Sequence, residues 1–259
     1  MLPKDKLLAG SDNPEELARI LDKAESALRK WEVTLCDFYG PPVIYEATEI
    51  FSRLTEISLI SGGGYPQAER QRIALARAEI PLSEELVDLT LLSVAGNFLF
   101  DPATHRDFLG AVLGTGIVRH KVGDIVVLGE RGAQILVVPE IADFLQTALN
   151  QVRSVPVKTT PIPLSDLKIR PPKTKEMTTV EASLRLDAIA SAGFGMSRSK
   201  MADAIGAGDV RVNWKEITQA SHGLQTGDLV TYRGKGRLAI GDINVTKKSR
   251  YRIELTRYQ

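Results

Sequence analysis

The stretch that decides the fold lies between Leu184 and Arg237 and contains four short motifs. They are, in chain order, Leu184-Arg185-Leu186-Asp187, Ser197-Arg198-Ser199-Lys200, Gly208-Asp209-Val210-Arg211-Val212-Asn213 and Gly234-Lys235-Gly236-Arg237. The apolar spacing predicts a helix from Val180 to Phe194 that ends at Gly195, and Ser197 is placed to cap a second helix. Val210 and Val212 begin a strand after it. The stretch therefore predicts a small domain of two helices followed by β-strands.

Cations in this stretch lie where the backbone itself can bind an anion. Arg198 and Lys200 follow the cap, so the free N–H groups of a helix start lie beside two flexible positive side chains. Glycines separate the last three cations and let a phosphate approach the backbone. The candidate RNA-binding residues are Arg185, Ser197, Arg198, Ser199, Lys200, Arg211, Asn213, Lys215, Arg233, Lys235 and Arg237.

Some of these residues have simpler explanations that stay open at this point. Arg185 could pair with Asp187 or Glu181, and Arg211 could be a solvated strand residue. Asp187 is better explained as a structural acceptor at a helix or turn than as a ligand to RNA.

The formal net charge of +1 conceals a division of charge along the chain. Residues 161–259 contain 17 Lys+Arg and 10 Asp+Glu, a net charge of +7. Residues 1–160 contain the remaining 16 Lys+Arg and 22 Asp+Glu, a net charge of −6. The basic segment is therefore the one expected to contact a polyanion.

Composition excludes several classes of protein. The single cysteine, Cys36, rules out a disulfide framework, and with three histidines it argues against a metal site. The chain shows no secretory leader and no run of eighteen apolar residues, so we expect a cytoplasmic protein without a membrane span. No cluster of histidine, cysteine or paired carboxylates has catalytic spacing, so we expect no catalytic residues, no cofactor and no metal.

Residues 1–82 are predicted to form an N-terminal α/β domain. Helical spacing covers residues 11–33 and 44–54, and a short strand covers 56–60. The glycines of residues 61–66 follow that strand but lack the Gly-Lys-Ser/Thr ending of a phosphate loop. We interpret them as a tight turn that places Arg70 and Arg72 near a surface.

Residues 83–163 are predicted to alternate strand, helix, strand, strand, helix and strand, the ferredoxin-like βαββαβ order shared by RNA-recognition motifs. The strands contain Leu, Val and Ile instead of base-stacking aromatics, which favours a packing or docking domain. His105-Arg106-Asp107 resembles a kinase tripeptide by accident, because it opens a helix that Asp101 or Thr104 caps. A secondary basic patch is expected from Arg106, Arg119, His120 and Lys121, with a solvated face as the alternative.

Prolines mark the boundary before the last domain. Residues 164–178 are rich in proline and lysine and are predicted to be an extended linker. Residues 179–259 then form the C-terminal domain. The fold class is therefore α+β, with a helical α/β segment, a ferredoxin-like middle domain and the motif-bearing domain at the end.

The stretch from Leu184 to Arg237, which also contains Gly227-Asp228, resembles the S4 RNA-binding domain of the αL type. The family pattern is Arg-Leu-Asp, a helix, Ser-Arg-Ser-Arg/Lys, a helix, Gly-x-Val-x-Val-Asn and Gly-Asp, and this chain matches it over about residues 180–240. Trp214 departs from the glycine that many members have after the asparagine; it could stack on a base or cover the core.

Motifs outside that domain extend the resemblance to nearly the whole chain. The segments 63–66, 68–70, 105–111 and 122–125, together with Asn213-Trp214-Lys215, look like the YlmH family of S4-domain proteins, and most like its cyanobacterial and plastid branch, which bears the label photosystem II S4 domain protein. The resemblance implies non-catalytic binding of structured RNA, both rRNA and tRNA, on the large ribosomal subunit during rescue of stalled nascent chains.

Two other functions compete with that expectation. An RNA-modifying enzyme would need a catalytic domain or a cofactor loop, and only about twenty residues follow Arg237. An adaptor would use the acidic first 160 residues to bind a protein partner and the S4 domain as an anchor on RNA.

Overall fold

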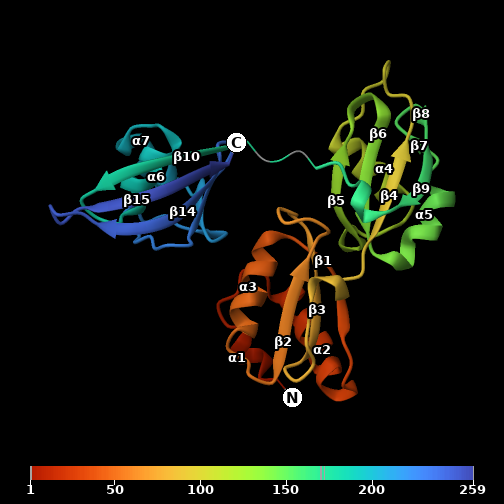
Figure 1. Cartoon of the computed structure of the whole chain (residues 1–259), viewed down its shortest axis with the longest axis horizontal. Coiled ribbons are helices and arrows are strands. Elements are labelled where there is room, and N and C mark those ends of the chain that lie inside the picture. Colours follow the sequence, from red (N-terminus) through yellow and green to blue (C-terminus); the bar gives the residue numbers. More distant parts are fainter. Residues whose placement is uncertain (1, 170, 172, 259) are drawn as a thin grey trace. The chain divides into compact units, whose positions relative to one another are not determined.

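A computed structural model describes residues 2–169, 171 and 173–258 (Figure 1). It divides into two units, residues 1–169 and residues 170–259. Among the described residues, no helix is long and apolar enough to cross a membrane.

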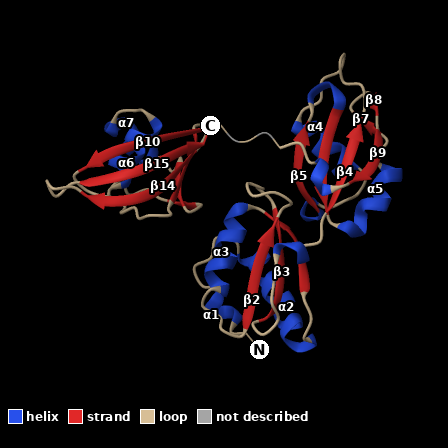
Figure 2. Ribbon diagram, viewed as in Figure 1, coloured by secondary structure: helices blue, strands red, loops and turns tan. Residues whose placement is uncertain are grey.

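The first half of unit 1 is a three-stranded antiparallel sheet with helices on it (Figure 2). Its elements are α1 (Lys4–Leu7), α2 (Pro14–Lys30), β1 (Thr34–Tyr39), α3 (Pro41–Phe51), β2 (Ile57–Gly62) and β3 (Gln71–Arg77), and the strand order is β1-β3-β2. The apolar stripe of α2 is fully buried at Leu17, Ile20 and Leu21, as its spacing predicts. No strand was predicted for β1, because Asp37 interrupts its apolar residues.

The second half of unit 1 contains a four-stranded antiparallel sheet with the order β5-β6-β4-β9. Its helices and strands are β4 (Thr90–Ala95), α4 (His105–Gly114), β5 (Val122–Val127), β6 (Gly132–Val137), α5 (Ala142–Ala148), β7 (Gln151–Val152), β8 (Val155–Pro156) and β9 (Lys158–Ile162). The predicted order of strands and helices is present, with the short β7-β8 hairpin added. Thr104 begins α4 in a capping box with Asp107, in agreement with one of the two predicted caps.

Unit 2 is a six-stranded antiparallel sheet with two helices on one face. Its elements are β10 (Thr174–Glu181), α6 (Leu186–Phe194), α7 (Arg198–Gly206), β11 (Val210–Val212), β12 (Lys215–Glu216), β13 (Leu229–Tyr232), β14 (Gly236–Val245) and β15 (Tyr251–Tyr258), in the order β10-β15-β14-β13-β11-β12. Ile189 and Met201 pack against Val230 and Leu238 in the core between helices and sheet. Each such fully buried side chain contributes about 1.5–3 kcal/mol.

Two predictions about residues 164–194 were wrong in part. Thr174–Glu181 is strand β10 and pairs with β15 along its whole length, so the expected extended linker ends earlier, and the helix begins at Leu186 instead of Val180. Thr178, Thr179 and Val180 are β-branched, and a neighbouring strand is available to pair with them, which outweighs the apolar spacing. Residues 170 and 172 of the expected linker lie outside the described residues.

The glycine turn after β2 also differs from its prediction. A Cβ at Gly63 would lie 2.5 Å from the carbonyl oxygen of Arg70, so the turn packs backbone against backbone. Arg72 is 2% exposed and donates from Nε to the Cys36 carbonyl oxygen at 2.9 Å. The turn therefore directs Arg72 into the interior and not toward a surface.

Candidate nucleic-acid interface

The start of α7 presents backbone N–H groups beside exposed polar and positive side chains. The Ser197 hydroxyl caps the helix by accepting the Lys200 N–H at 3.4 Å, and the Ser199 hydroxyl lies 3.3 Å from it. Arg198, Ser199 and Lys200 are all exposed. Helix starts concentrate positive potential, so this turn can hold a phosphate between backbone N–H groups and the Lys200 ammonium.

A buried carboxylate holds the two arginines nearest this turn. Asp187 accepts from Arg185 Nε and Nη2 at 3.1 and 3.0 Å, and from Arg198 Nε and Nη2 at 3.1 Å each. The Asp187 side chain is 7% exposed, whereas those of Arg185 and Arg198 are 40% and 55% exposed. One negative charge therefore orients two positive ones whose outer N–H groups still face solvent, which leaves a net positive cluster.

The protonation of Asp187 follows from this geometry. Burial by itself raises the pKa of Asp187, but the hydrogen bonds from Arg185 and Arg198 outweigh it and hold the pKa below its ordinary value. The same bonds raise the pKa of Arg185. The carboxylate is thus ionised at neutral pH, and Asp187 is the structural acceptor that the sequence indicates.

Asn213 and Trp214 form the turn between β11 and β12, both in the left-handed region with φ of 49° and 70°. The Asn213 amide oxygen accepts the Leu229 N–H at 2.9 Å, and its amide nitrogen donates to Asp228 at 2.8 Å. These bonds tie the turn to β13, so Asn213 acts first as a structural residue. Trp214 is half-buried, and the Arg237 guanidinium lies 5.8 Å from its ring centroid.

Arg211 and Arg237 lie on the sheet face opposite the helices. Both pair directly with Thr231, on either side of β13, so the three residues point to one face. Their neighbours Val212, Val230 and Leu238 point to the core under α6 and α7. Arg211 and Arg237 are therefore separated by the sheet from the start of α7.

The turn between β13 and β14 holds Arg233 and Lys235, both exposed. Gly234 and Gly236 have φ of 72° and 101°, and a Cβ at Gly236 would lie 2.4 Å from the Tyr258 carbonyl oxygen. The glycines thus form the tight turn, in which Lys235 lies between them and Arg233 just before them. Lys215, on edge strand β12, is also exposed.

The candidates therefore do not form one continuous patch. Arg185, Ser197, Arg198, Ser199 and Lys200 gather at the helix starts; Arg211 and Arg237 share the opposite sheet face; Arg233 and Lys235 occupy a turn; Asn213 and Lys215 lie at the β11-β12 hairpin.

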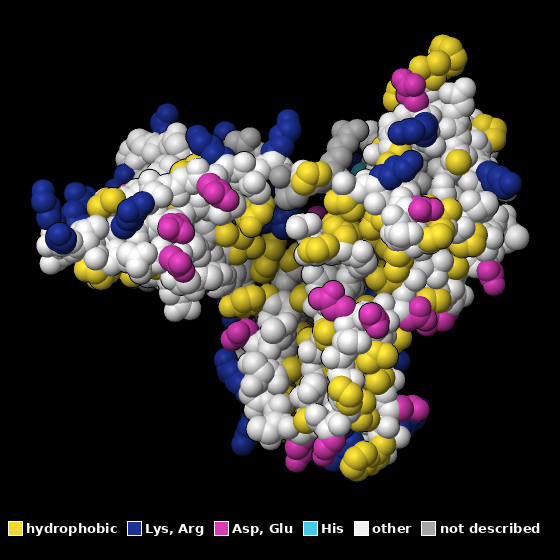
Figure 3. Space-filling model, viewed as in Figure 1, with side chains coloured by type: hydrophobic (Ala, Val, Ile, Leu, Met, Phe, Trp, Pro, Cys, Tyr) yellow, Lys and Arg dark blue, Asp and Glu magenta, His cyan; other side chains and the backbone are white. Residues whose placement is uncertain are grey.

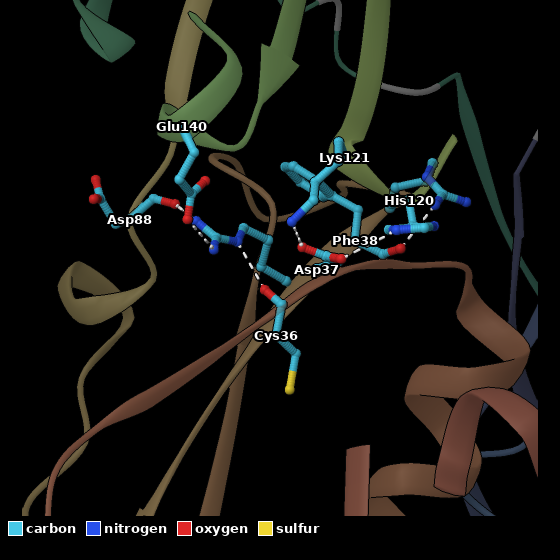
Figure 4. Close-up of polar contacts among 9 residues, drawn as sticks. Cys36, Asp37, Phe38, Asp88, His120, Lys121 and Glu140 are labelled. Atoms are coloured by element: carbon cyan, nitrogen blue, oxygen red, sulfur yellow. Dashed lines mark hydrogen bonds and ion pairs between the residues drawn. The ribbon is translucent and has the colours of Figure 1, made fainter. Parts of the chain in front are cut away.

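The predicted secondary basic patch is largely used for contacts within unit 1. Lys121 Nζ lies 2.6 Å from Asp37 Oδ1, and His120 Nε2 lies 3.3 Å from Asp37 Oδ2 (Figure 4). Arg119 donates to the carbonyl oxygens of Val122 and Gly123, and burial lowers its pKa. Local spacing could not predict these contacts because Asp37 lies 84 positions before Lys121, and the secondary basic patch stays a prediction.

The other member of that patch, Arg106, is exposed on α4. The contacts of Lys121 and His120 with Asp37 form a joint between β1 and the segment before β5, and Arg119 binds the start of β5. Arg70 also belongs to this joint: it donates to the Val122 and Phe38 carbonyl oxygens at 3.0 and 2.8 Å, and burial and the nearby Arg119 charge lower its pKa to about 10.

A cationic loop between β14 and β15 was not predicted from the sequence. Lys247, Lys248, Arg250 and Arg252 are all exposed, and Lys and Arg side chains gather at the end of unit 2 where β14 and β15 join (Figure 3). The signal was present as a run of cations without acids over residues 245–252, but it followed the recognised motifs and no strands were predicted around it.

The two helices on an antiparallel sheet, the capped basic helix start and the arginine pair on Asp187 define an S4-type RNA-binding protein. Family models match three parts of the chain: "YlmH, N-terminal" over residues 12–80, "Putative RNA-binding domain in YlmH" over residues 82–166 and "S4 domain" over residues 184–230. The chain belongs to the YlmH family.

Two known proteins are similar to this chain. The chain is 33% identical over 232 residues to the ribosome-associated protein quality control protein P2 of Bacillus subtilis, covering 88% of each chain. It also resembles the solved structure of the cell division protein ylmH from Streptococcus pneumoniae, with a TM-score of 0.52 and 19% identity, covering 60% of this chain and 93% of that one. The second likeness concerns the fold alone.

Proposed function

We propose that this protein binds structured RNA, both rRNA and tRNA, on the large ribosomal subunit as a non-catalytic factor in ribosome-associated quality control. The observation that supports it most is the start of α7, where a capped helix, the exposed Lys200 and the Asp187-held Arg198 converge. The name of the Bacillus subtilis relative, a ribosome-associated protein quality control protein, supports the ribosome as the setting. A factor that works on ribosomes would act in the cytoplasm.

Two parts of the surface would make different contacts. The start of α7 would bind a phosphate through backbone N–H groups, which carry no sequence information. Trp214 beside Arg237 offers an aromatic face with a cation next to it, which suits an unstacked base. Because the sheet separates these two places, the RNA would have to pass around an edge of unit 2 to reach both.

The test compares Lys200→Glu with a matched pair of controls, Lys6→Glu and Lys23→Glu, which are exposed lysines in unit 1. We avoid Arg198→Glu because it would place a second carboxylate against buried Asp187. RNA affinity is measured by fluorescence anisotropy at several salt concentrations. We expect Lys200→Glu to weaken binding and to lower the log–log salt slope by about 1, with the controls unchanged.

Sedimentation in sucrose gradients, with and without nuclease, then tests the ribosomal setting. Wild-type protein should move with the large subunit, and Lys200→Glu should leave that fraction. Unchanged sedimentation of Lys200→Glu, together with a flat salt response, would contradict the proposal.

A second candidate function is an RNA-anchored adaptor whose first 160 residues bind a protein partner. It is favoured by the loop after β4, where Leu99 and Phe100 are 50% and 90% exposed. The resemblance to the cyanobacterial and plastid branch with its photosystem II label belongs with this alternative. A protein that is captured by wild-type chain after nuclease treatment, but not by Leu99→Ser/Phe100→Ser, would support the adaptor.

The βαββαβ half of unit 1 is proposed to be an RRM-like domain used for docking. Its central strands β4 and β6 present buried Leu92, Val94 and Ile135 to their own core. With no base-stacking aromatic in those strands, contact with RNA would have to come from other parts of the domain.

A further inference from the structure

The β14-β15 hairpin ends in a loop of residues 246–250 that lies beyond the S4 match at residues 184–230. Residues 245–252 contain four cations and no acidic residue: Lys247, Lys248, Arg250 and Arg252. All four are exposed. The hairpin thus has a strongly positive tip. None of its four cations belongs to the candidate RNA-binding surface described above.

The loop has a defined conformation. The Thr246 N–H donates to the Arg250 carbonyl oxygen at 2.7 Å, the Ser249 N–H donates to the Thr246 carbonyl oxygen at 3.0 Å, and the Arg250 N–H donates to Thr246 Oγ1 at 3.1 Å. Arg250 Nη2 also donates to the Val180 carbonyl oxygen of β10 at 3.1 Å. A ligand that binds the tip therefore has little backbone entropy to overcome.

Lys247 and Lys248 have no acidic partner within the part of the chain that the structure describes, whereas Arg250 is partly engaged with β10. Two adjacent lysines without counter-charges repel one another, and an external anion relieves that repulsion. The tip shows no exposed aromatic ring, since Tyr251 is half-buried. Its chemistry therefore suits phosphates and not bases.

The position of the tip sets which part of an RNA it can reach. β14 has ten residues, so the tip lies about 30 Å along the strand from the turn that holds Arg233 and Lys235. β10 ends at Glu181 opposite Tyr251, and Arg185 follows four residues later, so the tip lies at the end of the sheet where the chain enters α6. A short RNA segment cannot contact both ends of β14.

We propose that the β14-β15 tip is a second RNA-contact site, in which Lys247 and Lys248 bind the sugar-phosphate backbone of a double-helical segment adjoining the segment held at the start of α7. The proposal rests on the RNA-binding function proposed above. Contact would be independent of sequence, and it would lengthen the RNA site instead of adding base recognition.

The test uses the full chain and two RNA hairpins, with stems of about 8 and about 20 base pairs, a range that brackets the reach of known duplex-binding domains. Lys247→Gln/Lys248→Gln is compared with Lys6→Gln/Lys23→Gln, which removes the same charge from unit 1. We expect the tip variant to lose about five- to tenfold affinity for the long stem and about 1.5 to 2 units of log–log salt slope. Its affinity for the short stem and its melting temperature should match the control.

The other possible outcomes show whether this inference alone or also the proposed function is wrong. If the wild-type chain binds the long stem and the tip variant binds it with the same affinity, this inference is wrong and the proposed function remains. If the wild-type chain binds neither stem, both are wrong. Lysine-dependent binding to vesicles of phosphatidylcholine and phosphatidylserine, with unchanged RNA affinity, assigns the tip to a membrane surface and also overturns the inference. A second variant, Lys247→Glu/Lys248→Glu, should give a larger loss on the long stem.

Discussion

Arg198 donates two hydrogen bonds to the carboxylate of Asp187, which lies eleven residues earlier and is almost completely buried. This pair fixes the first residue of α7 to the second residue of α6, so the basic helix start is positioned by a residue that itself cannot reach RNA. Arg185 binds the same carboxylate. Orientation of the proposed phosphate site at the start of α7 therefore depends on the buried negative charge of Asp187.

Replacing Asp187 by asparagine tests that dependence. The amide cannot accept both bidentate pairs, and the two guanidinium groups would repel one another without the carboxylate. We expect unit 2 to lose about 1–3 kcal/mol of stability, less than a fully buried pair would cost because both arginines are partly exposed. In a Trp31→Phe background Trp214 is the only tryptophan, so its fluorescence in urea reports unit 2. Asp203→Asn, an exposed aspartate on α7, is the control and should change little.

The pH dependence of stability offers a second check on Asp187. Its pKa is lowered in the folded chain, so its contribution is fully present above the unfolded value of about 3.9 and is lost as pH falls through the lower folded pKa. We expect the urea-unfolding free energy of unit 2 to fall more steeply with decreasing pH below about 4 in wild-type protein than in Asp187→Asn. Parallel curves for the two proteins would contradict the assignment.

Local patterns predicted those parts of unit 2 that depend on nearby residues. The Ser197 cap, the end of α6 at Gly195 and the acceptor function of Asp187 follow from spacing along a few turns of chain. Strand β10 was not predicted, because it exists through pairing with β15, 70 to 84 positions later. Long-range pairing overrides the local preference of such a segment.

The same limit of local patterns explains why the contacts of the secondary basic patch were not predicted. A cation in a sequence reports its charge but not its partner, and no sequence prediction concerned Asp37. In the fold it pairs with both Lys121 and His120. By contrast, strand alternation could have predicted that the candidate residues divide between the two faces of the sheet. Once the strands are placed, Arg211 and Arg237 alternate with buried Val212 and Leu238, so they must lie on the opposite face.

Gly236 should be the glycine of unit 2 least tolerant of a side chain. Its φ of 101° is unfavourable for other residues, and a Cβ would lie 2.4 Å from the Tyr258 carbonyl oxygen on the neighbouring strand. We expect Gly236→Ala to destabilise unit 2 by more than about 2 kcal/mol in urea unfolding. The matched control is Gly206→Ala at the end of α7, where a Cβ meets nothing within 4 Å, and stability should stay the same or rise by up to about 1 kcal/mol. Equal effects of the two variants would show that the β13-β14 turn can relax.

Asp124 should control the coupling of the two halves of unit 1. Its carboxylate accepts from the Tyr65 hydroxyl at 2.7 Å and from the N–H groups of Glu69 and Arg70 at 2.7 and 3.0 Å, so a residue of β5 orders the turn between β2 and β3. Asparagine retains one acceptor oxygen and loses the charge, which leaves at least one of these donors without its partner. Each such loss costs about 1–3 kcal/mol.

Hydrogen–deuterium exchange measures this coupling directly. In Asp124→Asn we expect the amides of Glu69 and Arg70 to exchange faster, and residues 12–80 to open at lower urea concentration than residues 82–166. Asp5→Asn, which changes an exposed aspartate on α1, should leave both halves as in the wild-type protein. If the amides of Glu69 and Arg70 keep their protection in Asp124→Asn, the joint is held instead by Arg70 and by the Asp37–Lys121 pair, because these contacts do not pass through Asp124.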